Sequence, residues 1–176
     1  MLTYEDAIQR ILRATPAPRT SVVRLDEALG LVLAKPVVAP IDLPSFDNSA
    51  VDGYALRVAD APVSDGAATA SLRVIGASEA GRPFAGVVGE REAVRILTGA
   101  RMPEGADAVV MQEHARRRGD CLTVLQPPKP GQHIRRRAED LRRGAQVLAP
   151  GALLRPQEIG LLASLGRRAV TVYPRP

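Results

Sequence analysis

The middle of the chain constrains the fold most, because residues 51–125 divide into short apolar pieces of the kind that form β-strands. Each piece is bounded by Gly, Pro, Asp or Ser, which favour turns. The pieces are GYALRV, SLRVIG, AVRILTG, DAVVMQE and CLTVLQP. The RRRGD segment between the last two predicts a hairpin loop. Short strands at this spacing predict a small β-barrel or β-sandwich.

Both ends of the chain carry helical patterns instead. Residues 3–14 predict a helix that Thr3 caps, with one apolar face formed by Ala7, Ile8, Ile11 and Leu12. Residues 156–165 predict a second helix, because Pro156 suits a first helical turn and Gly166 suits the position after the last one. The segment RAVTVY that follows predicts a strand.

The domain organisation follows from these patterns. The two terminal helices need a common core, so the β-rich middle is expected to be an insertion. We predict a β-rich α+β fold with two lobes: a segmented α/β domain from residues 1–47 and 135–176, and an inserted, small β-barrel-like domain from residues 48–134. Smaller features are a helical turn at 26–29 and a hairpin in QVLAPGALL around Pro150.

Composition limits the type of protein. Hydrophobic residues make up 45% of the chain and aromatic residues 3%, so a core of Leu, Val, Ile and Ala is expected. No apolar run is long enough to span a bilayer, and the opening MLTYEDAIQR carries acids where a signal peptide is basic. The single Cys121 excludes an internal disulfide. We therefore expect a cytoplasmic protein without membrane attachment.

The charge is basic, with 24 Lys and Arg against 19 Asp and Glu. Arginine clusters at 116–118 and 135–137 could bind phosphate groups, although a solvated charged face is the default explanation. Nucleic-acid binding is the weakest hypothesis, because the chain offers few aromatic residues on which bases could stack. His114 and His133 lack the spacing of zinc ligands, which disfavours a zinc site.

Three polar stretches are candidates for chemistry. They are LPSFDNSAVDGYALR, RILTGARMPEGADAVVMQE and RRRAEDLRRGAQVL. Each also has a purely structural explanation, since Asp, Asn and Ser form local turns and caps, and an exposed acid beside arginines forms a weak ion pair. From the residues alone, these stretches indicate an anion or metal site built from acids and arginines.

In this order, the three stretches resemble the N-terminal half of molybdopterin molybdenumtransferases, the MoeA family that includes the E domain of gephyrin. The resemblance runs from the first helix to VTVYPRP. It implies the last step of molybdenum cofactor synthesis, in which molybdate is inserted into adenylylated molybdopterin with release of AMP and a requirement for Mg²⁺. It also implies a homodimer whose cleft lies between the β-rich domain of one subunit and the molybdopterin-binding domain of the other.

The resemblance also implies the site residues. Asp52, Thr98 and Asp140 match residues of the family's cleft and are expected to be catalytic, with Asp52 and Asp140 as Mg²⁺ ligands directly or through water. Thr98 could donate to a phosphate oxygen, and Arg95 or Arg137 could add charge-assisted contacts. The expected substrate-binding residues are Asp47, Asn48, Ser49, Gly99, Arg137 and Glu139.

One departure from the family pattern affects the expected activity. In the family the chain continues into a molybdopterin-binding α/β domain, whereas this sequence stops at Pro176. We expect either a fragment of a longer enzyme or a stand-alone relative that works with a separate molybdopterin-binding protein. In both cases this chain would form one wall of a shared site and be inactive alone. The alternative is a non-catalytic binding or dimerisation module that keeps the fold.

Overall fold

The computed structural model describes residues 2–16, 19–61 and 70–175. It divides into two compact units, Met1–Pro40 with Gly144–Pro176 (unit 1) and Ile41–Arg143 (unit 2). The boundaries expected at 47/48 and 134/135 therefore fall inside unit 2, and the segments 41–47 and 135–143 pack with the β-rich part. None of the described helices combines the length and the apolar character needed to cross a bilayer.

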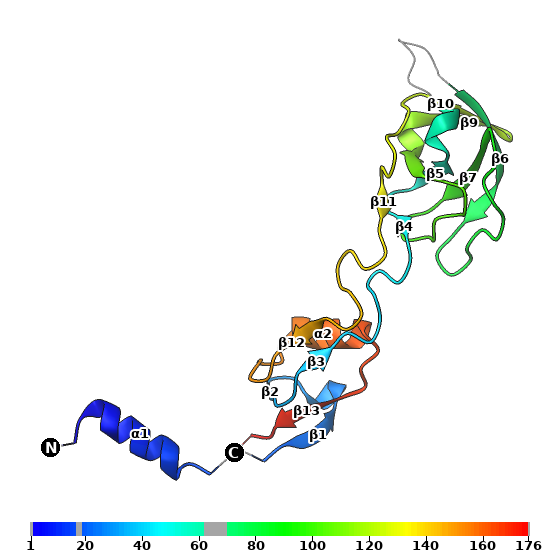
Figure 1. Ribbon diagram of the computed structural model, residues 1–176. Helices are drawn as coiled ribbons and strands as arrows, with labels where there is room; N and C mark the ends of the chain where they lie inside the picture. Colours follow the sequence, from blue (N-terminus) through cyan, green and yellow to red (C-terminus); the bar gives the residue numbers. More distant parts are fainter. Residues whose placement is uncertain (1, 17–18, 62–69, 176) are drawn as a thin grey trace. The chain divides into compact units, whose positions relative to one another are not determined.

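Unit 1 is built on a three-stranded antiparallel sheet in the order β1-β13-β2, together with a β12–β3 pair and the helix α2 (Figure 1). Its core consists of aliphatic side chains, among them Leu33, Leu154, Leu162 and Val172. The elements are β1 (Ser21–Arg24), η1 (Leu25–Glu27), β2 (Val32–Leu33), β3 (Val37–Val38), β12 (Gln146–Leu148), α2 (Pro156–Ser164) and β13 (Ala169–Tyr173).

Helix α2 forms where the sequence predicts it. Pro156 is its first residue, and the Glu158 carboxylate accepts a hydrogen bond of 3.0 Å from the Arg155 N–H. The N–H groups at this end have no helical acceptor, so the Glu158 side chain satisfies one of them. Gly166 follows the helix with a φ of 72°, which glycine adopts without strain. The short helical turn predicted at 26–29 is the 3₁₀ turn η1.

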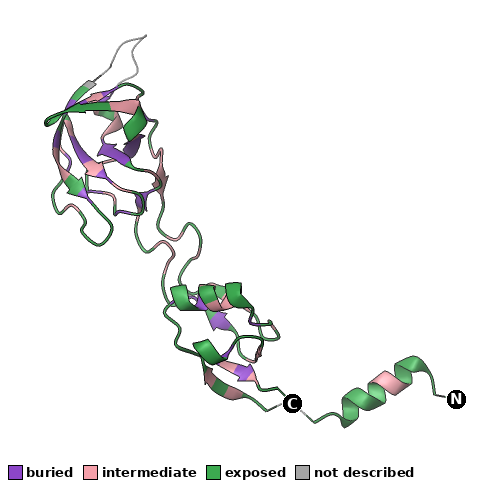
Figure 2. Cartoon of the chain, turned by 180° about the vertical axis from the view of Figure 1, so that it is seen from behind, coloured by how far each residue is buried: buried purple, intermediate pink, exposed green. Residues whose placement is uncertain are grey.

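Two expectations for unit 1 are wrong. Helix α1 (Tyr4–Ala14) is capped by Thr3 as predicted, but none of its residues is buried, so it shares no core with α2 (Figure 2). The hairpin expected in QVLAPGALL does not form, because β12 pairs with the distant strand β3. The turn residue Gly151 instead donates its N–H to the carbonyl of Leu33, at 2.7 Å. The turn at Pro150 and Gly151 does form, with the Ala152 N–H donating to the Ala149 carbonyl at 3.3 Å, but the residues on either side of it pair with other segments instead of with each other.

Unit 2 is a curled six-stranded sheet in the order β8-β5-β7-β6-β10-β9, which confirms the barrel-like character predicted for this region in a partly open form (Figure 1). All neighbours are antiparallel except β6 and β7. A further pair joins β4 to β11. The elements are β4 (Asn48–Ser49), β5 (Gly53–Leu56), η2 (Val58–Asp60), β6 (Ala70–Ser78), β7 (Glu92–Ile96), β8 (Ala108–Met111), η3 (Gln112–His114), β9 (Ala115–Arg118), β10 (Cys121–Val124) and β11 (Ile134–Arg135).

Strand β5 is buried on both faces. Tyr54 and Leu56 belong to one core cluster of unit 2, whereas Ala55 belongs to a second one. Successive strand residues point to opposite faces, so β5 lies between the two clusters. It also pairs with β7 on one edge and β8 on the other. Asp52, which directly precedes β5, is therefore attached to the most enclosed strand of the unit.

The hairpin predicted around RRRGD forms between β9 and β10, which are paired from Ala115 and Val124 to Arg118 and Cys121. Its three arginines lie in the edge strand β9, and the turn itself is Gly119 and Asp120. Charged side chains on an edge strand disfavour pairing with other chains. The 116–118 cluster thus has a structural explanation as part of β9.

Candidate functional site

The backbone brings the three polar stretches together. Strand β4 pairs with β11 of the arginine-rich stretch, with Ser49 opposite Ile134. On its other side, Ser49 donates its N–H to the carbonyl of Ala100 at 3.0 Å and accepts from the Gly99 N–H at 2.8 Å. The DNS segment therefore lies between the loop that follows β7 and the strand that begins the arginine-rich stretch.

Asp52 and Thr98 form the closest pair of predicted site residues. The Asp52 Oδ1 atom accepts hydrogen bonds from the Thr98 backbone N–H and from its hydroxyl, both at 2.8 Å. These bonds, together with the positive charge of Arg95, lower the pKa of Asp52. Both side chains are exposed, and Oδ2 of Asp52 accepts no hydrogen bond from the described residues. The carboxylate is thus ionised, held at one oxygen and open at the other.

Asp140 is held by an arginine. Both of its carboxylate oxygens accept from one terminal nitrogen of Arg135, at 2.6 and 2.5 Å. Its side chain remains 55% exposed. No hydrogen bond or ion pair connects this pair to Asp52 and Thr98 in the part of the chain that the structure describes.

The rest of the arginine-rich loop is fixed by three other carboxylates. Asp47 accepts from the Arg137 N–H and from the Arg136 guanidinium, both at 2.7 Å. Asp42 accepts from Nε of Arg137 at 2.6 Å and from the Arg143 N–H at 2.7 Å. Glu139 accepts from the Arg136 N–H at 2.8 Å. Several anchors of this kind hold residues 135–143 against residues 41–47.

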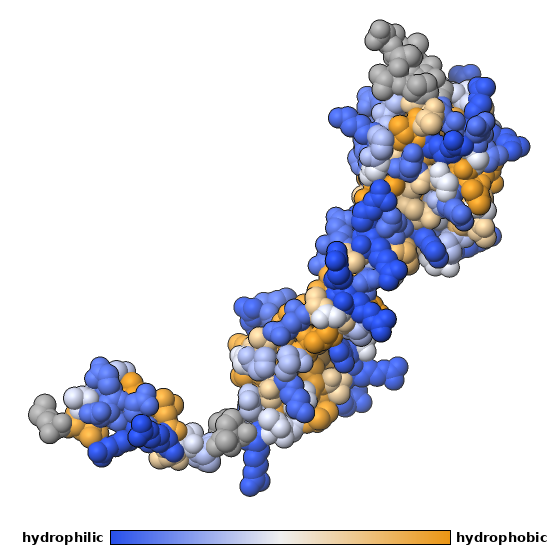
Figure 3. All heavy atoms as spheres, viewed as in Figure 1, coloured by the Kyte–Doolittle hydropathy of each residue, from blue (hydrophilic) through white to orange (hydrophobic). Residues whose placement is uncertain are grey.

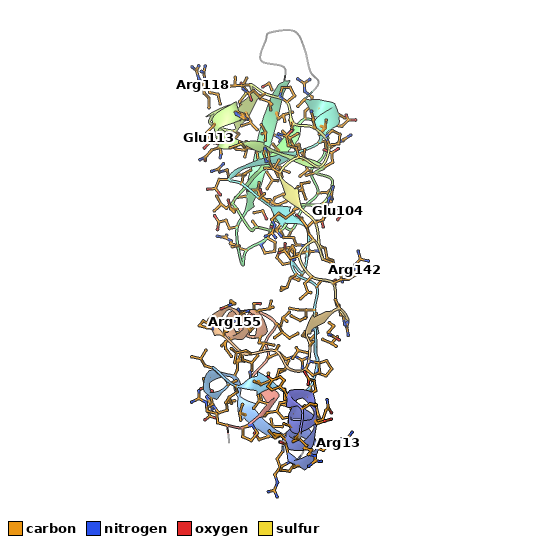
Figure 4. The ribbon with its side chains drawn as sticks, turned by 90° about the vertical axis from the view of Figure 1, so that its left-hand side faces the viewer. Arg13, Glu104, Glu113, Arg118, Arg142 and Arg155 are labelled. Atoms are coloured by element: carbon orange, nitrogen blue, oxygen red, sulfur yellow. The ribbon has the colours of Figure 1, made fainter. Side chains whose placement is uncertain are left out.

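Hydrophilic side chains gather over this loop in the space-filling view (Figure 3). Arg142 projects outward from it, and Arg118 of β9 lies at the opposite end of unit 2 (Figure 4). The arginines of β9 are thus remote from those of the loop. The 116–118 cluster and the candidate site are therefore separate surfaces of unit 2.

Asn48 and Ser49 have local partners. Asn48 is buried and donates its side-chain amide to the Phe46 carbonyl at 3.2 Å. Ser49 is buried and donates its hydroxyl to the Val51 carbonyl at 2.6 Å. These bonds are the turn-forming bonds that polar residues make in loops. Gly99 is exposed and turns the chain after Thr98 with a φ of 79°.

A cleft of about 400 Å³ adjoins the candidate site in unit 2. Asp47, Arg137, Arg101 and Glu104 supply its charged lining, and Phe46 and Met102 supply apolar surface. Asp52, Thr98 and Asp140 are not among its lining residues. Of the predicted residues, this cleft therefore unites only Asp47 and Arg137, and the common surface expected for the three catalytic candidates stays a prediction.

The donor set fits Mg²⁺ at one position. No group of three or more His, Cys, Asp or Glu side chains within residues 2–16, 19–61 and 70–175 could enclose a metal ion. Mg²⁺ does not require such a group, because it keeps several waters and binds one or two carboxylates together with substrate phosphates. Oδ2 of Asp52 fits this mode. Asp140 fits it poorly, because Arg135 engages both of its oxygens.

Three residues that the sequence reasoning did not select take part in the local network. Asp42 anchors the arginine-rich loop, and Tyr54 and Gln112 contact Arg95 next to Asp52. Asp42 comes directly before the first polar stretch, which was the only available signal for it. Nothing in the sequence distinguishes Gln112, since its contact depends on how β5, β7 and β8 are aligned.

Acid is expected to destabilise unit 2. Accepted hydrogen bonds and nearby arginines lower the pKa of Asp42, Asp47 and Asp52 in the folded chain. A carboxyl group with a lowered folded pKa stabilises the fold above its unfolded pKa of about 3.9, and that contribution is lost as the pH falls through the folded value. The free energy of unfolding should therefore decrease steadily below about pH 4.

Urea unfolding at a series of pH values measures this loss of stability. The NMR methyl signals of Leu56, in the core of unit 2, follow the unfolding. The variant Asp47→Asn removes one of the three groups, so its stability should depend less on pH than that of the unchanged chain. Equal slopes for the two chains between about pH 5 and about pH 3 would contradict the role assigned to Asp47.

Comparisons with known proteins agree with this structure. The model of the MoeA N-terminal region (domain I and II) matches residues 2–166. The chain is 45% identical over 175 residues to the molybdopterin molybdenumtransferase of Haemophilus influenzae, covering 98% of this chain and 42% of that protein. The enzyme of the same name from Staphylococcus aureus (strain Mu50) is 37% identical over 175 residues, covering 99% of this chain and 42% of the relative.

A solved structure is similar over the whole chain. The molybdopterin biosynthesis moeA protein of Pyrococcus horikoshii OT3 has a TM-score of 0.90 and 39% identity, covering 100% of this chain and 47% of that one. The chain thus spans less than half the length of these relatives. The resemblance inferred from the three polar stretches is confirmed. This chain belongs to the family of MoeA N-terminal regions.

Proposed function

We propose that this chain forms one wall of the site at which molybdate is inserted into adenylylated molybdopterin during molybdenum cofactor biosynthesis. The observation that carries the proposal is the Asp52–Thr98 pair: an exposed, ionised carboxylate held at one oxygen by two hydrogen bonds of 2.8 Å. The names of the relatives, molybdopterin molybdenumtransferase, support this reaction. The polar loop is then polar because it faces a charged ligand.

Each residue has a physical role in this proposal. Thr98 keeps Asp52 oriented, so that the free oxygen presents its charge in a fixed direction. Arg137 binds Asp42 through Nε, and its remaining N–H groups can contact phosphate or molybdate oxygens at the edge of the cleft that it lines. Asp140 keeps Arg135 in place through two short contacts. Fixed charges of this kind stabilise charge that develops in a transition state.

Asp52 is the residue that would hold Mg²⁺ in this proposal, through its free carboxylate oxygen. When bound, Mg²⁺ offsets the charge that develops on a phosphate leaving group. The predicted role of Asp140 as a second ligand requires the release of Arg135, which holds both of its oxygens. Of the two candidates, Asp52 is therefore the one supported by the geometry.

The proposal includes a homodimer, in which a molybdopterin-binding domain of the partner subunit completes the site. The exposure of Asp52 and Thr98 supports this part, because charged catalytic groups are most effective where water is excluded. A separate protein that carries a molybdopterin-binding domain would serve equally well.

A chimera tests the proposal: these 176 residues joined to the remaining part of the Haemophilus influenzae relative. We expect it to release AMP from adenylylated molybdopterin in the presence of molybdate and Mg²⁺. Asp52→Asn should lower kcat by about a hundredfold or more, as loss of a preorganised charge does in other enzymes. The matched control is Asp120→Asn in the β9–β10 turn, which should retain full activity. Equal rates for both variants would overturn the proposal.

The alternative function is a binding or dimerisation module without catalysis. One observation favours it: α1 leaves Ile11 and Leu12 65% and 61% exposed, which is typical of a surface covered by a partner. The chimera separates the two functions. If the chain is a non-catalytic module, the chimera should form a dimer but release no AMP, and Asp52→Asn should change nothing.

A further inference from the structure

Arg95 is held in one orientation by three contacts. It lies on β7 directly opposite Tyr54 of β5, and its guanidinium carbon is 5.1 Å from the centre of the tyrosine ring. One terminal nitrogen donates to the Gly53 carbonyl at 3.1 Å. The other donates to the Gln112 side-chain oxygen at 2.6 Å. Tyr54 is only 8% exposed, so the ring is a rigid support.

The contacts of Arg95 converge on Asp52. Gly53 is the next residue in the chain, and the Gln112 backbone N–H donates to the Asp52 carbonyl at 3.1 Å. The side-chain amide of Gln112 is itself fixed, since its oxygen accepts from Arg95 and its nitrogen donates to the Glu113 carboxylate at 3.2 Å. The backbone of Asp52 is therefore tied to Arg95 through both Gly53 and Gln112.

We propose that Arg95 is a positioning residue for Asp52, joining Gly53, Tyr54 and Gln112 into a brace that keeps the Asp52 carboxylate in bonding position with Thr98. The inference rests on the proposed function insofar as Asp52 matters for turnover. Thr98 follows Arg95 by three residues, just after β7 ends at Ile96, so one continuous segment supplies both the brace and the hydrogen-bond donors. Arg95 touches no reacting atom in this role.

Arginine suits this role and lysine does not. A planar guanidinium can donate to two acceptors while it stacks on an aromatic ring, whereas an ammonium group lacks this fixed fork of donors. Lysine at position 95 would keep the positive charge near Asp52 but lose the brace. The substitution Arg95→Lys thus separates positioning from charge.

Amide hydrogen exchange in the 176-residue chain tests the proposal. The N–H groups of Thr98 and Gln112 donate directly to Asp52, so their protection reports its side chain and its backbone. We expect Arg95→Lys and Arg95→Gln to lower both protection factors by about tenfold, the effect of weakening one hydrogen bond. The Val74 N–H, which donates to the Asp120 carbonyl, reports the general stability of unit 2 and should change little.

Arg73→Lys is the matched control, because Arg73 binds Glu92 on the same sheet and does not contact the site. It should leave the Thr98 and Gln112 amides unchanged. Two results would overturn the proposal: wild-type protection in Arg95→Lys, which would leave only a role for charge, or an equal loss at Val74, which would mean a general loss of stability.

Turnover is a separate readout. In the chimera, Arg95→Lys should lower kcat about tenfold with little change in KM. A displaced Asp52 carboxylate would stabilise the transition state less, while substrate binding would change little. If the chimera is inactive while the two amides respond as expected, the proposed function fails and the brace stands. If the chimera is active and neither amide responds, the brace fails and the proposed function stands.

Discussion

The isolated 176-residue polypeptide is expected to release AMP from adenylylated molybdopterin at no more than about a thousandth of the rate of the chimera, with molybdate and Mg²⁺ supplied to both. The physical reason is orientation. Holding reactants in a shared, ordered site contributes about 7–11 kcal/mol to catalysis, and a single wall of that site retains little of it. The measurement is the initial rate of AMP release at equal protein concentrations.

Two further results belong to the same prediction. The isolated polypeptide should bind adenylylated molybdopterin weakly and lose that binding as salt is added, because exposed arginines supply most of the attraction. Mixing it with the remaining part of the relative, supplied as a separate polypeptide, should restore turnover. Asp52→Ala should abolish this gain. Substantial AMP release by the isolated polypeptide would show that the active site has been misplaced.

Gly53→Ala is expected to have the largest effect on stability. A Cβ atom at Gly53 would lie 2.0 Å from the Val110 carbonyl oxygen and 3.1 Å from the Val109 side chain. Val110 belongs to β8, which pairs with β5, so relief of the overlap requires separation of two paired strands. We expect a loss of about 3 kcal/mol or more in the free energy of unfolding.

Gly160→Ala is the control for this substitution. Gly160 lies inside α2, has an ordinary φ, and has open space where a Cβ would be placed. Alanine there should stabilise unit 1 by about 0.5–1 kcal/mol, because it restricts the unfolded chain and favours the helix. Chemical denaturation of both variants measures the contrast. A Gly53→Ala chain as stable as the unchanged one would contradict the tight packing of β5 against β8.

Local signals in the sequence predicted much of the fold. The alternation of short apolar pieces gave the strands of unit 2, and Pro156 and Gly166 marked helix α2, because each signal acts within a few residues. The prediction of a hairpin around Pro150 was wrong for the same reason, namely that the signal extends over only a few residues. A Pro-Gly turn signal is local, whereas β12 pairs with Val37 and Val38 from the other end of the chain.

The candidate site was harder to predict from the residues alone. The bond between Asp52 and Thr98 depends on the alignment of β5 with β7, which places Gly53 opposite Ile96. No spacing along the chain encodes that alignment. Only the resemblance to a family grouped these residues beforehand. It did not include Gln112, whose contact with Arg95 appears only once β8 lies beside β5.

The burial of β5 on both faces determines how the site can move. Local opening is cheapest where few apolar contacts are lost, at chain ends and surface loops. Asp52 directly precedes a strand that lies between two core clusters, so a large displacement of its backbone would disturb both of them. This side of the site therefore behaves as a rigid template. Adjustment to the ligand is expected to come from exposed side chains or from the surface that faces Asp52.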